Sequence, residues 1–387
     1  MGGVANGDGV GGEGLGGMSS GGTPTVEAGG SDAAGSTSTT IGGSAGGGSS
    51  TSGSGGSGAG SSGGGGTAGV LGRAVVVDGK RILVGGEPFH IRGVNWNPVP
   101  RGGRHPEDLD FAGFAATDIP LMQSAGLNAV RTYEPLLDRA VLDQFEEAGI
   151  FVLNTVYPYG GAAPSVVTDR VNQVKDHPAI LMWVIGNEWN YNGLYTSPQG
   201  SFEQSISLLA EASALIKAAD ASHPIASVYG ELAGIEVAMN ALPDVDVWGI
   251  NAYRGISFGE LFATWETLTS TSPKPMFLAE YGADAFNSIT GSPDVEAQAE
   301  ATRALTQEIL ANSAALAEGS CSGGTVFEWA DEWWKAEGDP SAHDNGGIGV
   351  EGGPHPDNTF NEEWWGLVDI DRNARPAYYE LQSLYTN

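Results

Sequence analysis

Short apolar segments alternate with longer amphipathic segments from about residue 90 to the end of the chain. The apolar segments are nearly continuous, as expected of strands that are buried on both faces of a parallel sheet. They predict eight strands, namely HIRGVNW (90–96), LNAVRTY (127–133), IFVLNTVY (150–157), ILMWVIGNE (180–188), PIASVYG (224–230), DVWGINAY (246–253), PMFLAEYG (275–282) and GTVFEWADEWW (324–334).

The amphipathic segments between these strands carry apolar residues at intervals of three and four, which predicts helices. Clear cases are FAATDIPLMQSAG (114–126), LDRAVLDQFEEAG (137–149) and SFEQSISLLAEASALIKAAD (201–220), and the first two end on a Gly typical of a helix C-terminus. Eight strands that alternate with helices predict an α/β fold of the (β/α)8, or TIM barrel, class. An open doubly wound sheet is the alternative, but no Gly-rich phosphate loop follows the first strand.

Two features precede the predicted barrel. AVVVDGKRILVGGEPFH (74–90) predicts a short β-hairpin with Asp78-Gly79 at its turn. Residues 1–70 are mostly Gly, Ser, Thr and Ala and contain no aromatic residue, so they cannot bury enough apolar surface to offset the entropy of ordering. We therefore predict a disordered Gly/Ser-rich tether over residues 1–70 and one domain over residues 71–387.

A tether of this kind is common in exported bacterial surface proteins. We therefore expect a secreted or cell-surface location, and we hypothesise that an export signal with a lipid-attachment cysteine was removed. No stretch approaches the roughly 20 apolar residues of a membrane span, so membrane insertion by the domain is not expected.

The formal net charge is −30 at pH 7, and only Asp8, Glu13, Glu27 and Asp32 of the acidic residues lie in the tether. A domain this acidic repels phosphate groups, which excludes nucleic acid and anionic membranes as partners and leaves neutral substrates open. We expect a monomer. The single cysteine, Cys321, excludes an intrachain disulfide framework.

Metal, cofactor and esterase signatures are missing from the sequence. The six His show no HExxH spacing, and no GxSxG nucleophile elbow occurs, so we expect no cofactor and no catalytic metal. His177 and His223 each precede a strand as part of a turn. Calcium binding by the loop over residues 336–365 stays open as an alternative, although its polar residues match no EF-hand spacing; they are Asp344, Asn345, Asp357, Asn358 and Glu362.

Two predicted strands end in carboxylates. Asn187-Glu188 closes the fourth strand, and Glu280 lies at the end of the seventh. In a (β/α)8 barrel the carboxyl ends of the strands form the active face, so both side chains are expected at one mouth. Two buried carboxyl groups in close proximity cannot both ionise easily, which separates them into a nucleophile and a general acid. Retaining glycoside hydrolases need such a pair.

These motifs resemble clan A of the (β/α)8 retaining glycoside hydrolases. The chain looks most like the family 72 β-1,3-glucanosyltransferase catalytic domain, with the family 2 glycosidase barrel as a second relative. The resemblance covers roughly residue 74 to the C-terminus and rests on IRGVNW, DIPLMQSAGLNAVRTYEP, VIGNEWNYN, VWGINAYRG, PMFLAEYGAD and GGTVFEWADEWW. It implies that Glu188 is the acid/base, that Glu280 is the nucleophile, and that Asn187 donates to the sugar 2-hydroxyl.

The resemblance also implies supporting roles around the nucleophile. Tyr253 would hydrogen-bond Glu280, Arg131 would keep it ionised, and Trp329 would form the floor beneath the reacting sugar. From the residues alone, Arg131 could instead be a structural ion-pair partner, and Tyr253 could be a packing residue.

Aromatic residues gather near the predicted strand ends, where they can stack on the apolar faces of sugar rings. The candidates for substrate binding are Trp96, Tyr133, Tyr157, Trp189 and Trp333; core packing is the alternative for each. We expect a retaining hydrolase or transglycosylase acting on a neutral β-glucan, with β-1,3-linked substrate as first choice from the resemblance. The alternatives are a β-mannan or β-galactoside hydrolase and a non-catalytic carbohydrate-binding surface protein.

Overall fold

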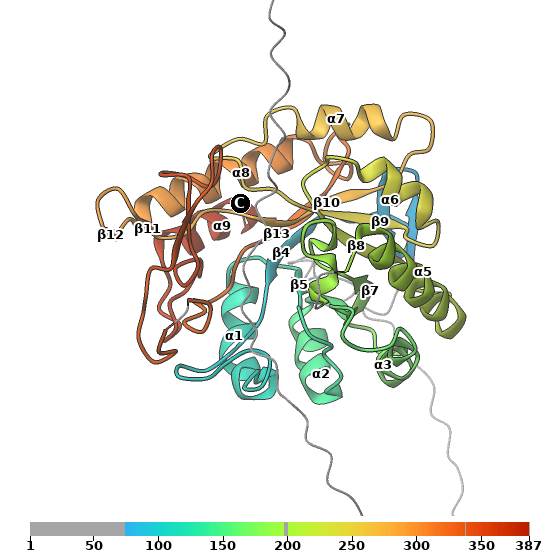
Figure 1. Ribbon diagram of the computed structural model, residues 1–387, viewed down its shortest axis with the longest axis horizontal. Helices are drawn as coiled ribbons and strands as arrows, with labels where there is room; N and C mark the ends of the chain where they lie inside the picture. Colours follow the sequence, from blue (N-terminus) through green and yellow to red (C-terminus); the bar gives the residue numbers. More distant parts are fainter. Residues whose placement is uncertain (1–73, 197–199, 337, 387) are drawn as a thin grey trace, which may run out of the picture. The chain divides into compact units, whose positions relative to one another are not determined.

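A closed parallel barrel forms the centre of the molecule (Figure 1). The computed structural model describes residues 74–196, 200–336 and 338–386, and the predicted tether lies outside them. In these residues the barrel order is β10-β13-β4-β5-β6-β7-β8-β9, which confirms the predicted fold class. The strands are β4 (Ile91–Asn95), β5 (Ala129–Arg131), β6 (Phe151–Tyr157), β7 (Ile180–Ile185), β8 (Ile225–Gly230), β9 (Val247–Asn251), β10 (Met276–Tyr281) and β13 (Cys321–Val326).

Helices surround this barrel (Figure 1). They begin and end largely with the capping residues that the sequence supplies: Asp138 accepts a hydrogen bond from the first turn of α2, and Gly149 ends that helix at φ 72°. Ser201 and Gln204 form a capping box at the start of α5. The helices are α1 (Phe111–Ser124), α2 (Arg139–Ala148), α3 (Val166–Val174), α4 (Trp189–Asn192), α5 (Phe202–Ala219), α6 (Ile235–Ala241), α7 (Leu261–Leu268), α8 (Val295–Ala311) and α9 (Pro376–Thr386), with a 3-10 turn at Gly193–Tyr195.

The hydrophobic core has two parts. The larger part lies between the barrel and its helices, and the smaller part fills the barrel interior. The interior cluster includes Ile82 and Val84 of the antiparallel sheet that precedes the barrel, together with Ile91 and Phe151 at the beginnings of barrel strands. This sheet therefore packs against the amino ends of the strands, which leaves the carboxyl ends for a site.

The antiparallel sheet differs in detail from the predicted hairpin. Its strands are β1 (Val75–Asp78), β2 (Arg81–Val84) and β3 (Glu87–Pro88), so a third strand is present. Asp78 pairs with Arg81, which places the turn at Gly79 and Lys80, one residue later than predicted.

The eighth barrel strand begins and ends earlier than predicted. It starts at Cys321 and ends at Val326, so the aromatic residues from Phe327 onward follow the strand instead of extending it. The added start of the strand includes Gly323, whose φ is 109° and where a Cβ would lie 2.1 Å from the carbonyl oxygen of Ile91. A glycine-rich segment thus pairs closely with β4, although its sequence lacks the apolar pattern of a strand.

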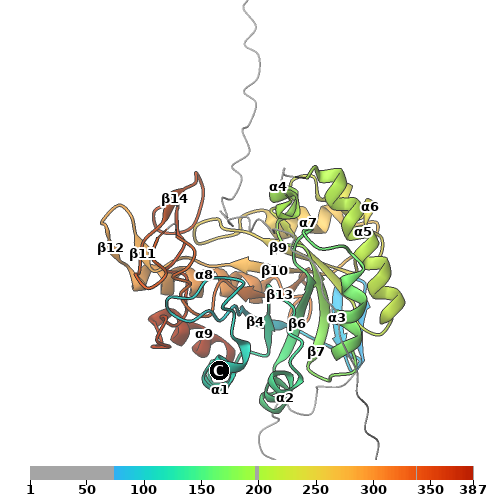
Figure 2. The same cartoon turned by 60° about the horizontal axis from the view of Figure 1, so that its bottom comes forward.

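A long segment links β13 to α9. It contains β14 (Gly347–Gly349) and β15 (Thr359–Asn361), which pair antiparallel, and a second small ribbon is formed by β11 (Phe286–Asn287) and β12 (Ser292–Pro293) before α8. In Figure 2, β14 and helix α4 lie on the same side of the barrel strands. Among the described residues, no helix has the length and apolar character needed to cross a membrane.

Candidate active site

Glu280 lies on β10 with three hydrogen-bond donors around its carboxylate. Arg131 Nη1 is 3.0 Å and the Tyr133 hydroxyl 2.7 Å from Oε1, while the Tyr253 hydroxyl is 2.8 Å from Oε2. Burial, with the negative charge of Glu280 as the next cause, raises the pKa of Tyr133 and of Tyr253 well above the usual value, so both hydroxyls keep their protons. Donors on both oxygens are the environment of a charged, oriented carboxylate.

Arg131 is itself fixed by its neighbours. It is fully buried at the end of β5, and its guanidinium donates to Asn95 Oδ1 at 3.0 Å and to Asn187 Oδ1 at 2.7 Å. The expected contacts of Arg131 and Tyr253 with Glu280 are therefore present. Because a buried ion pair is favourable only when its remaining donors are also satisfied, Asn95 and Asn187 are part of what holds the pair.

Glu188 lies three residues after the end of β7 and has a different environment. Its carboxyl group accepts a hydrogen bond of 3.1 Å from Asn251 Nδ2. Burial, and then the negative charge of Glu280, raise the pKa of Glu188 to about 7, against the opposing effect of Asn251. Glu188 therefore retains its proton up to about neutral pH, as a general acid requires.

The backbone at Glu188 is strained. Its φ of 47° and ψ of 29° lie in the left-handed region, which non-glycine residues rarely adopt. A hydrogen bond from its amide to Val228 O, 3.1 Å long, connects this turn to β8. Such strain costs about 1–3 kcal/mol and is typically found where a side chain must point in a particular direction.

Asn187 lies between the two glutamates. Its Oδ1 accepts from Arg131 and, at 3.3 Å, from Asn251 Nδ2. This fixes the orientation of the amide and directs its nitrogen away from Arg131, where Asn187 also shares a hydrogen bond with the Tyr195 hydroxyl. The orientation suits donation to a substrate hydroxyl.

Trp329 does not form a floor beside these groups. Only 1% of its surface is exposed, and its ring packs in the core against Tyr378, with centroids 6.3 Å apart. The aromatic ring at the site belongs to Phe327, which makes edge contacts with Tyr133 at 6.4 Å and Tyr253 at 6.2 Å. The prediction for Trp329 was wrong because β13 ends earlier than expected. Of residues 327–329, Phe327 and not Trp329 therefore faces the nucleophile.

Three other predicted substrate-binding aromatics are buried away from the carboxylates. Trp96 donates to Asp118 and packs on Phe145, Trp189 stacks on Phe202 and donates to Ser227, and Tyr157 donates to Ala162 O. None of the three indole or phenol rings exposes any surface. They form packing and anchoring contacts, and their apolar flanking residues in the sequence already favoured this alternative.

Trp333 also lies outside the group of residues around Glu280. Its ring stacks on His343 at 4.7 Å, and the Arg101 guanidinium lies 4.2 Å from its centroid. His343 in turn stacks on Trp364 at 3.7 Å. All three rings belong to the long segment after β13, and Arg101 contacts this stack from the segment after β4, so Trp333 is an anchor of the long segment. Of the five aromatics predicted to stack on sugar rings, only Tyr133 hydrogen-bonds a catalytic candidate in the described residues, and it does so through its hydroxyl.

Comparison with known proteins identifies the family. The model named glycosyl hydrolases family 2, TIM barrel domain, matches residues 158–387. This chain belongs to that family. The match includes both glutamates, Asn251 and Tyr253, so the family 2 barrel carries most of the site described above.

Curated relatives of this family 2 barrel include β-glucuronidases. The chain is 26% identical to the Mus musculus enzyme over 248 residues, covering 57% of this chain and 35% of the relative, and 27% identical to that of Chlorocebus aethiops over 263 residues, covering 61% and 37%. The chain thus spans about a third of the length of these relatives. Family 2 was the second relative in the sequence resemblance, and the family 72 assignment receives no support.

Solved structures agree on the fold. The GH2 β-galacturonidase from Eisenbergiella tayi bound to galacturonate superposes with a TM-score of 0.56 at 20% identity, over 81% of this chain and 54% of that chain. At this identity the likeness concerns the barrel alone.

Asn95 and Asn251 are site residues that sequence analysis missed. Each is the last residue of an apolar strand, in RGVN and WGIN, and so carried the same signal that identified Glu188 and Glu280. Their side chains contact Arg131 and Glu188, respectively. They position the catalytic candidates.

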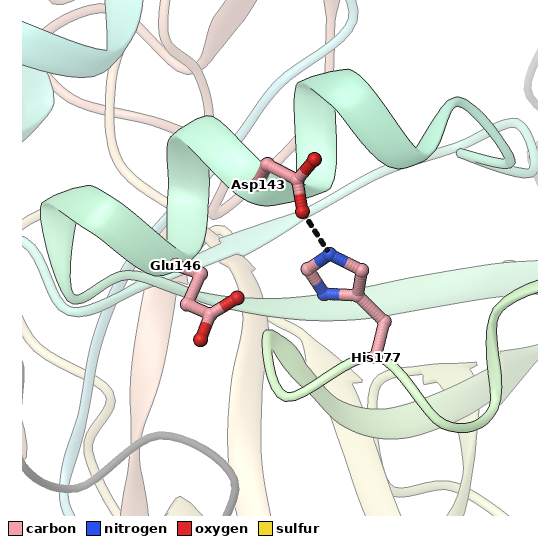
Figure 3. A group of neighbouring side chains, drawn as sticks. All are labelled: Asp143, Glu146 and His177. Atoms are coloured by element: carbon pink, nitrogen blue, oxygen red, sulfur yellow. Dashed lines mark hydrogen bonds and ion pairs between the residues drawn. The ribbon is translucent and has the colours of Figure 1, made fainter. Parts of the chain in front are cut away.

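A second group of titratable residues lies away from the active site (Figure 3). Asp143 and Glu146 on α2 and His177 before β7 have potential ligand atoms within 4.8 Å of one another. However, Nδ1 of His177 accepts from the Ala179 amide at 3.2 Å, so in the neutral ring Nε2 carries the proton and donates to Asp143 at 3.0 Å. A protonated nitrogen cannot coordinate a metal, and His177 has the structural role predicted for it.

The calcium alternative in the loop over residues 336–365 also meets competing partners. Asp357 accepts hydrogen bonds from the amides of Ser288 and Thr359. Glu362 lies 3.6 Å from Lys335 Nζ. These two carboxylates are therefore engaged by protein groups.

Proposed function

We propose that this barrel is the catalytic domain of a retaining β-glycoside hydrolase, with Glu280 as nucleophile and Glu188 as general acid and base. The observation that carries the proposal is the difference between the two carboxyl groups. Glu280 faces Arg131 and two tyrosine hydroxyls, whereas burial and the neighbouring negative charge raise the pKa of Glu188 to about 7. A charged nucleophile and a protonated acid at one barrel mouth are what double displacement requires.

In the proposed mechanism, each step falls to particular atoms. Glu280 attacks the anomeric carbon while Glu188 gives its proton to the departing glycosidic oxygen, which yields a glycosyl-enzyme and a free leaving group. Glu188, now ionised, then removes a proton from water, and the resulting attack releases Glu280 and a product of retained configuration. Asn187 donates to the 2-hydroxyl as positive charge develops at the anomeric carbon.

We propose a neutral β-glucan as substrate, with β-1,3 linkage as first choice; attack by an acceptor sugar instead of water would make the enzyme a transglycosylase. The negative charge of the domain supports a neutral substrate, since it repels anionic polymers. A β-uronide is the second candidate, because the relatives are named β-glucuronidase and β-galacturonidase. Lys335, which lies against the Phe327 ring, is a cation near the site, but it already pairs with Glu332 at 3.1 Å and Glu362 at 3.6 Å.

The test is an incubation of wild type, Glu188→Ala and Glu280→Ala with laminari-, cello- and manno-oligosaccharides and with aryl β-glucosides, β-galactosides and β-glucuronides. Products are followed by mass and anomeric configuration. We expect wild type to release products of retained anomeric configuration from one of these series. Both variants should release none. Inverted products would contradict the mechanism. Binding of oligosaccharides without turnover of any substrate would favour the non-catalytic carbohydrate-binding alternative.

A further inference from the structure

A second pair of carboxyl groups lies beside the nucleophile. Glu328 and Glu332 follow β13 and expose only 1% and 4% of their surface, and their side chains share a hydrogen bond. Burial, and then the negative charge of Glu332, raise the pKa of Glu328 well above its usual range. The neutral form of Glu328 is therefore favoured.

Glu332 is well supplied with partners. Asn97 Nδ2 donates to its Oε1 at 2.8 Å, and Lys335 Nζ lies 3.1 Å from its Oε2. Glu328 lacks such partners. Its Oε1 atom is buried, but no group among the described residues donates a hydrogen bond to it. An unsatisfied buried polar atom costs on the order of 1–3 kcal/mol. Glu332 beside it keeps 4% of its surface accessible and is the member of the pair that a ligand can reach.

The position of this group relative to Glu280 follows from Phe327. The Phe327 ring contacts Tyr133 and Tyr253, whose hydroxyls both bond Glu280. Lys335 Nζ lies 4.1 Å from the centre of the same ring. Lys335, which pairs with Glu332, thus lies against the aromatic ring nearest the nucleophile, beside which the sugar under attack must lie.

We propose that Glu328, Glu332 and Lys335 recognise two neighbouring hydroxyl groups of the sugar that Glu280 attacks, which selects a neutral sugar over a uronic acid. The inference rests on the proposed function and names the substrate class of that site. Glu332 accepts a hydrogen bond from one sugar hydroxyl, Glu328 holds Glu332 in place through their shared hydrogen bond, and Lys335 donates to the neighbouring hydroxyl oxygen. A uronate carboxylate at this place would face Glu332 and Glu362, and Lys335 alone cannot offset both.

The experiment compares kcat/KM for a neutral aryl β-glycoside, its 3-, 4- and 6-deoxy analogues, and the matching uronide. We expect wild type to prefer the parent glycoside over one or two of the deoxy analogues by about ten- to hundredfold, the range for hydrogen bonds to charged groups. Glu332→Gln and Glu328→Gln lower kcat/KM for the parent by a similar factor but change that of the sensitive deoxy analogue much less. Glu332→Gln also raises the rate on the uronide relative to the parent.

Glu363→Gln is the matched control, because Glu363 is also buried but accepts only from the backbone amides of Ala336 and Asp344. This variant is expected to change kcat/KM for all substrates by one common factor. Equal losses on parent and deoxy substrates in Glu332→Gln, or a wild-type preference for the uronide, would overturn the inference while leaving the proposed function intact. A wild type that turns over no glycoside would overturn both. If a variant fails to fold, the inference is judged from the wild-type ratios of kcat/KM between the parent glycoside, its deoxy analogues and the uronide.

Discussion

Arg131 and Glu280 form an ion pair inside the barrel, with Nη1 and Oε1 3.0 Å apart and the arginine side chain wholly inaccessible to solvent. Each charge has lost its hydration, so each depends on the other and on the asparagines around the guanidinium. One contact thus serves both stability and the orientation of the nucleophile.

Replacing Arg131 by Met should therefore damage both properties. The uncompensated carboxylate is expected to lower the free energy of unfolding by about 3–5 kcal/mol, the cost of breaking a buried pair from one side. We expect kcat to fall at least a hundredfold, roughly. Urea unfolding measures the loss of stability. Steady-state kinetics, run about 20 °C below the melting temperature of the variant, measure the loss of kcat. A variant with unchanged stability and activity would show that the pair is dispensable.

Tyr253→Phe separates orientation from stability. It removes one hydrogen bond to Glu280 Oε2 but leaves the ring and its contacts with Phe327 and Trp365. We expect kcat to fall by about ten- to hundredfold, with a melting temperature close to that of wild type. Arg254→Lys, a change at the neighbouring residue, serves as control. Equal kcat values for Tyr253→Phe and wild type would make Tyr253 a packing residue, the alternative left open by the sequence.

The pH dependence should report Glu188. Its raised pKa means that the proton is bound below about pH 7 and lost above it. The protonated form is the active general acid, so kcat/KM for a substrate with a poor leaving group is expected to decline as pH rises through about 7. In Glu188→Gln this alkaline limb should disappear, and the rate at lower pH should fall by about 10²–10⁴. An unchanged limb in the variant would assign the ionisation to another group.

A buried ion pair behind the site should control stability. Arg375 binds Asp331 through two contacts of 2.6 Å, and both side chains are buried. Arg375→Met is expected to lower the free energy of unfolding by about 3–5 kcal/mol. The control is Arg303→Met, which breaks a half-exposed pair with Glu380. This variant should change the free energy of unfolding by less than about 1 kcal/mol. Equal losses of stability in the two variants would contradict a stabilising role for the buried pair of Arg375 and Asp331.

The sequence was sufficient for the features that follow from strand periodicity. A carboxylate at the end of an unbroken apolar strand must lie at the barrel mouth, and this argument placed Glu188 and Glu280. It also applied to Asn95 and Asn251, whose short amides carried no chemical signal that set them apart. Their roles emerge only when Arg131 and Glu188 are seen to need partners.

The aromatic residues could not be placed in the same way. Trp96, Trp189 and Trp329 are fully or almost fully buried, whereas Phe327 reaches the site. The observed strand ends differ from the predicted ones, and each difference changes which side chain faces the mouth. The start of β13 includes Gly323, which fits closely against Ile91, and a glycine carries no hydrophobic signal. The pair Glu328 and Glu332 was missed for the same reason.

Trapping the glycosyl-enzyme tests the central claim most directly. Wild type is incubated with a 2-deoxy-2-fluoro-β-glycoside bearing a dinitrophenyl or fluoride leaving group, and the labelled peptide is identified by mass spectrometry. We expect one sugar per molecule, attached through an ester to Glu280, and no label in Glu280→Gln. Label on another residue, or turnover of the natural substrate without any covalent species and with inverted products, would contradict the assignment of Glu280 as the nucleophile.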